Sequence, residues 1–173
     1  MTGHHTLAET ERAVRSRLGG IPLHWEQLQA AANLHRAAAA VRLHFENSVL
    51  RKPDLTWTAF VVLWVVWIWQ EMETRHVAAE AGITKGTLTG VVKTLEGRGL
   101  LRRVRHATDG RLVLLSLTPQ GVELMEELFP LFNAEEVFVT MPLSATECVE
   151  LADHLRAVIA HLEAHGAERR RSR

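Results

Sequence analysis

The 173-residue chain has a single cysteine, Cys148, so it cannot form an intramolecular disulfide bond. This excludes a small secreted fold held together by disulfides and fits a reducing compartment. Residues 1–10 also lack the basic segment followed by an apolar run that characterises a secretory signal. We therefore expect a cytoplasmic protein.

Long apolar runs are absent as well. The run Ala59–Trp69 contains eleven apolar residues, whereas a helix that crosses a bilayer needs roughly 18, so we expect a buried helix there. The chain has no repeat, no low-complexity block and no long linker. Its composition, 47% apolar and 23% charged, is typical of a globular protein, and we expect one domain over residues 1–173.

Net charge is also lacking, because 20 basic residues balance 20 acidic ones. Proteins that bind nucleic acid are commonly basic, so the total argues against such a partner. The distribution argues for it, since a local basic patch suffices to attract phosphates at short range. Between residues 84 and 111 seven cations outnumber Glu96 and Asp109: Lys85, Lys93, Arg98, Arg102, Arg103, Arg105 and Arg111.

Two helices are predicted before residue 53. Thr6 and Glu9 are spaced as a capping box, and the glycines at 19 and 20 end this first helix, which makes residues 1–20 an N-terminal appendage. Residues 22–52 carry apolar side chains at intervals of three or four and predict one long amphipathic helix. Such a helix would be roughly 40 Å long, so part of its apolar stripe should face another subunit.

The middle of the chain predicts a winged helix-turn-helix over residues 54–118. Thr56 caps an apolar helix that ends near residue 71, and two short helices follow at residues 74–81 and 84–98, with Gly82 at the corner. The β-prone runs 100–105 and 112–117 flank an Asp-Gly pair, which is a strong hairpin signal.

Residues 119–165 predict further helices, the last opened by a capping box at Ser144. Residues 166–173 are expected to form a disordered basic tail. The predicted fold is therefore mostly α, with a small β-hairpin wing. It is a winged helix-turn-helix flanked by N- and C-terminal dimerisation helices at 22–52 and 119–165.

Four short motifs, in this order and at these spacings, resemble the MarR family of bacterial regulators. They are Ile83-Thr84-Lys85-Gly86-Thr87-Leu88-Thr89, Leu95-Glu96-Gly97-Arg98-Gly99-Leu100, Asp109-Gly110-Arg111 and Leu117-Thr118-Pro119-Gln120-Gly121. The resemblance implies a homodimer whose terminal helices interlock. It also implies a recognition helix in the major groove of double-stranded DNA and a wing against the minor groove.

The candidate DNA-binding residues follow from the motifs and from groove chemistry. A helix fits the major groove, where each base pair presents its own donor and acceptor pattern. Thr84 is equally suited to cap the helix, and Lys93 is better placed for phosphate than for bases. Arg111 resembles the family's wing-tip arginine, which Asp109 would orient. The expected set is Thr84, Lys85, Thr87, Thr89, Lys93, Arg103, Arg105, Asp109 and Arg111.

Gly90 departs from the family pattern, which usually has arginine at this point of the recognition helix. The glycine removes a potential DNA contact and costs helix stability on the order of 1 kcal/mol relative to alanine. Operator specificity is therefore expected to differ at this position.

Family resemblance also implies a small, often aromatic and anionic, effector that releases DNA. The two long helices would line the effector crevice and offer Trp25, His35, Arg36, Arg42, Trp64 and Trp67. We therefore predict a ligand-responsive repressor that binds a pseudo-palindromic operator. We expect no cofactor, no bound metal and no membrane partner.

Three alternatives remain at the level of sequence. Neutral total charge and Gly90 leave room for a winged-helix module that binds proteins. His154, His161 and His165 share one helical face and suggest a metal-responsive regulator, although they span roughly 16 Å of helix axis and zinc needs closely grouped ligands. An enzyme is not expected, because no nucleophile–base pair or phosphate-binding loop is present.

Overall fold

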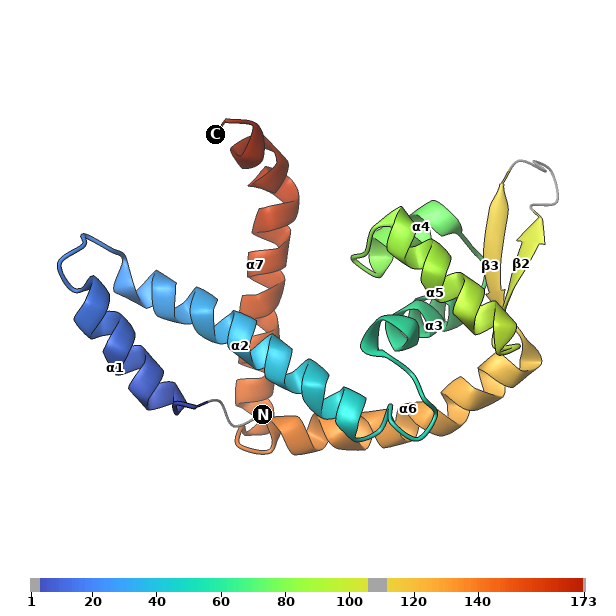
Figure 1. Ribbon diagram of the computed structural model, residues 1–173, viewed down its shortest axis with the longest axis horizontal. Helices are drawn as coiled ribbons and strands as arrows, with labels where there is room; N and C mark the ends of the chain where they lie inside the picture. The colour runs from blue at the N-terminus through green and yellow to red at the C-terminus, as the bar shows by residue number, and fades with distance from the viewer. Residues whose placement is uncertain (1–3, 106–111, 173) are drawn as a thin grey trace. The chain divides into compact units, whose positions relative to one another are not determined.

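The computed structural model describes residues 4–105 and 112–172 and divides into two compact units, Met1–Glu126 and Glu127–Arg173 (Figure 1). The boundary falls inside a helix rather than in a linker, which explains why composition gives no sign of it.

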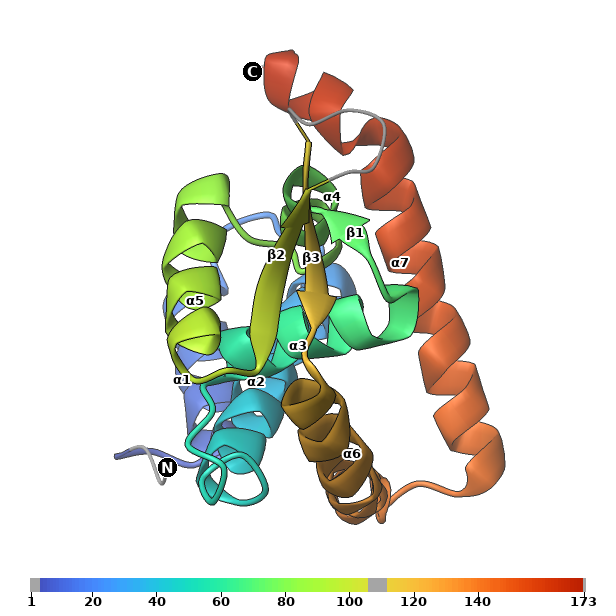
Figure 2. The same cartoon turned by 90° about the vertical axis from the view of Figure 1, so that its right-hand side faces the viewer.

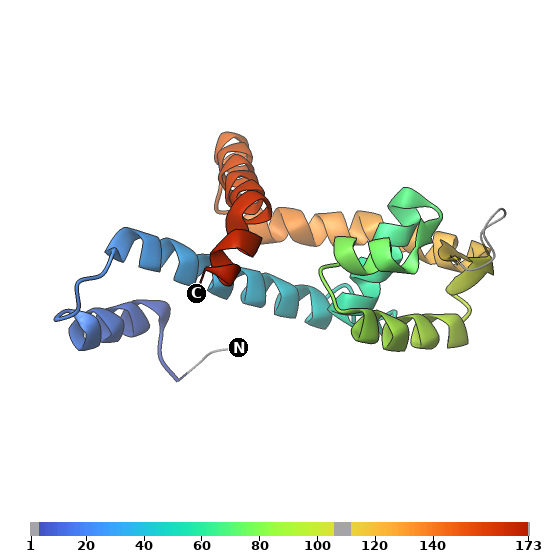
Figure 3. The ribbon, with the colours of Figure 1, turned by 90° about the horizontal axis from the view of Figure 1, so that it is seen from above.

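Two antiparallel helices begin the first unit, α1 (Leu7–Leu18) and α2 (Trp25–Asn47), and they lie side by side in Figures 1 and 3. The predicted capping box is present, because Thr6 Oγ1 accepts a hydrogen bond from the backbone N–H of Glu9 at 3.2 Å. Helix α2 is shorter than the predicted span 22–52 and buries only Phe45. Its apolar stripe is thus largely uncovered within one chain.

Helix α3 (Trp57–Trp69) supplies the centre of the first unit. The Thr56 side chain caps it at the backbone N–H of Ala59, at 3.2 Å. Its buried residues include Val62, Leu63 and Val66. The apolar sequence predicts a helix that is buried on most sides. The structure leaves one part of it open, because Trp69 is 58% exposed and Trp64 and Ile68 are exposed too.

Helices α4 (Thr74–Glu80) and α5 (Lys85–Gly97) form the predicted helix-turn-helix against α3. Gly82 makes the corner with φ +63°, a left-handed conformation that glycine adopts without steric cost. Its N–H donates to the carbonyl of Ala79, and the N–H of Ile83 donates to that of Ala78. These bonds end α4 and turn the chain into α5.

A three-stranded antiparallel sheet completes the module, with the order β1-β3-β2 (Figure 2). The predicted hairpin pairs β2 (Leu101–Arg105) with β3 (Val113–Leu117), Leu101 opposite Leu117. Strand β1 (Met72–Glu73), which the sequence does not predict, pairs with β3. Buried Leu115 fixes β3 against the core beside α3.

The chain ends in α6 (Pro119–Thr140), which continues through Pro130, and α7 (Ala145–Arg171). Because α7 runs to Arg171, residues 166–171 are helical where the sequence predicts a disordered tail. Arginines in the last turn favour this extension by interacting with the negative end of the helix dipole. Within the described residues, no helix has the length and apolar character needed to cross a membrane.

Candidate nucleic-acid interface

Helix α5 has one buried and one exposed face. Leu88, Val92 and Leu95 point into the core, whereas the predicted contact residues Lys85, Thr87, Thr89 and Lys93 are all exposed. The helix lies beside β2 (Figure 2). The module therefore presents a polar helical surface next to the base of the wing.

Thr84 is the N-cap of α5. Its Oγ1 accepts from the backbone N–H of Thr87 at 3.1 Å and lies 2.9 Å from Thr87 Oγ1. These bonds confirm the capping role that the sequence predicts for Thr84. They also mean that two of the candidate hydroxyls are already engaged with each other.

The Thr89 hydroxyl donates to the carbonyl of Lys85 at 2.9 Å. A hydroxyl that donates to its own helix can still accept a hydrogen bond, but it has no proton left for a phosphate oxygen. In this rotamer Thr89 is suited to the amino groups of adenine or cytosine in the major groove.

The cations of β2 differ in their surroundings. Arg103 forms an ion pair with Glu96 of α5 at 3.3 Å, while Arg102 and Arg105 are exposed and have no ion-pair partner among the described residues. Asp109 and Arg111, the predicted wing-tip pair, lie outside the described residues.

Arg98 belongs to the basic patch by sequence but has another partner. Its guanidinium donates to the carbonyls of Asp54 at 2.7 Å and Pro53 at 2.6 Å, and so joins the end of α5 to the loop before α3. In the described part of the patch, the exposed cations whose side chains have neither an ion pair nor a hydrogen bond are thus Lys85, Lys93, Arg102 and Arg105. The sequence gives no signal for the role of Arg98, because its partners lie 44 and 45 residues away.

The six residues predicted for the effector do not form one group. Trp25 and Arg36 line a pocket between α1 and α2. Arg42 instead bonds Glu46 at 3.4 Å on its own helix, His35 is exposed, and Trp64 and Trp67 belong to α3. The pocket also contains Glu11 and Arg15 of the appended helix, which the sequence does not single out.

The histidines of α7 give no metal cluster. His161 and His165 have ring centroids 5.0 Å apart, but no three His, Cys, Asp or Glu side chains in the described part of the chain are grouped closely enough to hold an ion.

Comparisons with known proteins find similar sequences for the winged helix-turn-helix module and for most of the rest of the chain. The model of the MarR family matches residues 55–113. The uncharacterized HTH-type transcriptional regulator YwaE of Bacillus subtilis is 35% identical over 162 residues, which cover 92% of this chain and 95% of that protein. The regulator MgrA of Staphylococcus aureus is 30% identical over 132 residues, covering 76% and 88%.

Solved structures are similar too. BpsR of Bordetella bronchiseptica, whose DNA binding is regulated by 6-hydroxynicotinic acid, superposes with a TM-score of 0.69 at 28% identity, over 75% of this chain and 98% of that one. PcaV of Streptomyces coelicolor gives 0.63 at 27% identity, over 78% and 98%. The chain belongs to the MarR family of winged helix-turn-helix transcriptional regulators.

Proposed function

We propose that the protein is a ligand-responsive repressor that binds a pseudo-palindromic operator as a homodimer. The observation that carries the proposal is the exposed polar face of α5 beside the exposed cations of β2. Each subunit inserts α5 in a major groove, and its wing follows the adjacent minor groove. The DNA-contacting residues are Thr84, Lys85, Thr87, Thr89, Lys93, Arg103, Arg105, Asp109 and Arg111.

These residues divide by task. Thr89 reads base edges, whereas Lys85, Lys93 and Arg105 attract phosphates and set affinity without reading sequence. Arg103 contributes least, because a phosphate must compete with Glu96 for its guanidinium.

Homodimer formation is supported by the helices outside the module. In α7, a helix of 27 residues, the buried residue is Gly166, and its exposed apolar side chains are Val149, Leu151, Val158, Ile159 and Leu162. Burying such side chains against a second copy removes a large apolar area from water. The largely uncovered apolar stripe of α2 also supports a homodimer.

An effector is supported by the relative BpsR, which responds to a single-ring aromatic acid. We infer that an effector of this kind releases the present protein from DNA.

The test is an electrophoretic shift of the DNA upstream of the protein's own gene, over a series of salt concentrations. Binding should weaken with salt, and Arg111→Ala should reduce affinity. Lys93→Gln should make the slope of log K against log salt shallower by about 0.9 for each phosphate that residue 93 no longer neutralises. Arg12→Gln, an exposed change on α1, is the control and should leave the slope unchanged.

Salt-independent binding that Arg111→Ala does not alter would contradict the proposal. It would instead favour a winged helix that recognises a protein.

A further inference from the structure

Glu96 is an acidic residue on the side of α5 that carries the candidate DNA contacts. It follows Thr89 and Lys93 at steps of four and three residues, so the three side chains lie along one side of the helix. Glu96 is half-buried. A carboxylate in this row repels phosphates, so its effect on DNA binding depends on what neutralises it.

The partner of Glu96 is Arg103, the middle residue of β2. Arg103 lies opposite Leu115 of β3, which is fully buried, so the arginine belongs to the inner face of the sheet. Its Nη2 lies 3.3 Å from Glu96 Oε2, and α5 runs beside β2 in Figure 2. The ion pair therefore joins the recognition helix to the base of the wing.

Arg103 thus differs from the cations around it. Lys93, Arg102 and Arg105 are exposed and have no ion-pair partner among the residues that the structure describes. Their charge is available to any phosphate that approaches. The charge of Arg103, in contrast, is cancelled by Glu96 before DNA arrives.

The ion pair is weak enough to exchange partners. Its two side chains are 47% and 30% exposed, and ion pairs at exposed positions contribute little to stability. A phosphate that the rest of the interface holds against the guanidinium can therefore replace Glu96. A phosphate that stays farther away cannot, because salt screens its attraction beyond about 10 Å at 0.1 M.

Operator DNA and other DNA differ in this respect. At an operator the base contacts of α5 fix the register of the complex and hold one phosphate beside β2, whereas other DNA is bound only by general attraction to phosphates. We propose that Glu96 is a specificity-determining residue, which keeps Arg103 from the phosphates of non-operator DNA and releases it to a phosphate at the operator. Glu96 acts through Arg103 and is thus a positioning residue. The inference rests on the proposed function, because it requires an operator.

The test compares two duplexes of equal length and composition, DNA from upstream of the protein's own gene and a shuffled version of it. The affinity of the full chain for each is measured over a salt series. Glu96→Gln keeps the size of the side chain and removes its charge. On the shuffled duplex it should make the slope of log K against log salt steeper by about 0.9, the value for one phosphate, and tighten binding about fivefold at 0.1 M salt. The slope for the upstream duplex should not change.

Arg103→Met should give the complementary result. It should make the slope for the upstream duplex shallower by about 0.9 and leave the slope for the shuffled duplex unchanged, because Arg103 contacts a phosphate only at the operator. In the double variant Glu96→Gln/Arg103→Met the effect of the glutamate substitution should disappear, as expected of residues that act through each other. A purely structural role of Glu96 would not make any slope steeper.

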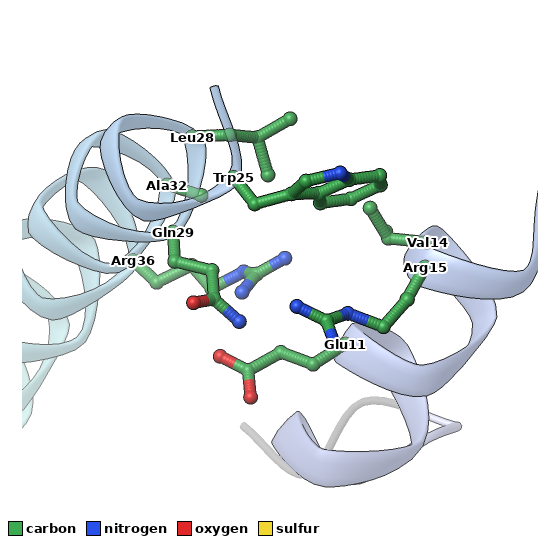
Figure 4. Close-up of a pocket in the computed structure, with 8 residues that line it drawn as sticks. All are labelled: Glu11, Val14, Arg15, Trp25, Leu28, Gln29, Ala32 and Arg36. Carbon is green, nitrogen blue, oxygen red and sulfur yellow. The ribbon is translucent and has the colours of Figure 1, made fainter. Parts of the chain in front are cut away.

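Two controls match these changes in charge. Glu26→Gln removes an exposed carboxylate from α2, and Arg12→Met removes an exposed guanidinium from α1. Neither residue belongs to the winged helix-turn-helix, and neither lines the pocket between α1 and α2 that Figure 4 shows. Both variants should keep the slopes of the unaltered protein on both duplexes. Circular dichroism verifies that every variant is folded.

An unchanged slope for Glu96→Gln on the shuffled duplex would overturn the inference. So would a shallower slope for Arg103→Met on that duplex, because the arginine would then contact phosphates without an operator. An effect of Glu96→Gln that persists in the double variant would show that the glutamate acts by its own charge. If the unaltered protein binds both duplexes equally, the proposed function fails, while the shuffled duplex still measures whether Glu96 holds Arg103 from phosphates.

Discussion

Gly121 shows how one residue fixes the junction between wing and helix. A Cβ at this position would lie 2.0 Å from the carbonyl oxygen of Leu100, a backbone atom that cannot move without shifting β2. The same carbonyl accepts from the N–H of Thr118, and Thr118 Oγ1 accepts from the N–H of Gly121 at 3.0 Å. The glycine is thus required by close approach of two backbones.

Gly121→Ala should therefore destabilise the protein by about 1–3 kcal/mol, as overpacking does in a close-packed interior. Chemical denaturation measures the change. Gly97→Ala is the control, because a Cβ at Gly97 would meet nothing within 4 Å. A Gly121→Ala protein as stable as the control would contradict the close approach.

Gly90 offers the opposite case on the exposed side of α5. A Cβ there meets nothing within 4 Å, so Gly90→Ala should raise the free energy of unfolding by about 0.5–1 kcal/mol through the loss of glycine's conformational freedom. Gly90→Arg should give a similar gain and also tighten DNA binding, with a steeper salt dependence. Thermal melts and gel shifts measure the two effects, and equal DNA affinity of the two variants would place residue 90 outside the interface.

At the scale of elements, Arg98 joins two segments that are remote in sequence. Its two bonds to the carbonyls of Asp54 and Pro53 hold the loop before α3 against the end of α5. Asp54 has φ +51°, an unfavourable value for a residue other than glycine. The tether helps to hold the loop in this conformation.

Arg98→Met keeps the length of the side chain but removes the donors, and should destabilise the protein by about 1–2 kcal/mol, the low end for bonds to a charged group because Arg98 is exposed. Lys93→Met, an exposed change on the same helix, should cost less than about 0.5 kcal/mol. Equal destabilisation of the two variants in urea would mean that the tether contributes nothing to stability.

The capping box of α7 gives a pH-dependent element. The backbone N–H and hydroxyl of Ser144 donate to Glu147 Oε2 at 2.8 Å and 2.7 Å, and these bonds hold the pKa of Glu147 below its ordinary value. A carboxyl whose pKa is lower in the folded state stabilises that state above its unfolded pKa and stops doing so as pH falls through the folded value.

Glu147→Ala should accordingly reduce stability at neutral pH, and its difference from the unaltered protein should shrink below about pH 4.3, the ordinary glutamate pKa. Melts over a pH series measure this difference. Glu163→Ala, farther along α7 and outside the capping box, is the control for removing a glutamate from this helix. A Glu147→Ala difference that stays constant down to acid pH would exclude the capping carboxylate as its cause.

The helix caps, strand β1 and the contacts of Arg98 differ in how far apart their partners lie along the chain. This difference explains which of them the sequence predicts. The caps at Thr6, Thr56, Thr84 and Ser144 were predictable because each bond joins residues three apart. Strand β1 was not, since two residues carry no periodicity and pair only through the tertiary fold. The sequence does not predict the pocket between α1 and α2 or the Arg98 tether for the same reason. Arg15 contacts Trp25, and Arg98 contacts Pro53, only in the folded chain.

At the scale of the whole molecule, the exposed apolar stripe of α7 predicts that the protein forms a dimer. Val158, Ile159 and Leu162 are exposed and lie on neighbouring turns of one face. Ile159→Asp would place a charge in the interface, at a large cost if it is buried unpaired. It should yield a monomer in light scattering after gel filtration and remove the rise of melting temperature with protein concentration that dimers show.

The matched control is Ala157→Asp, which puts the same charge on the side of α7 that carries Glu150 and His154. This variant should stay dimeric, because only the position of the charge has changed. If both variants remain dimers, the second copy does not pack on this stripe, and another surface must hold the two recognition helices at a fixed separation on DNA. If Ile159→Asp alone dissociates, its operator affinity should fall while the salt dependence per subunit persists, because each α5 keeps its own phosphate contacts.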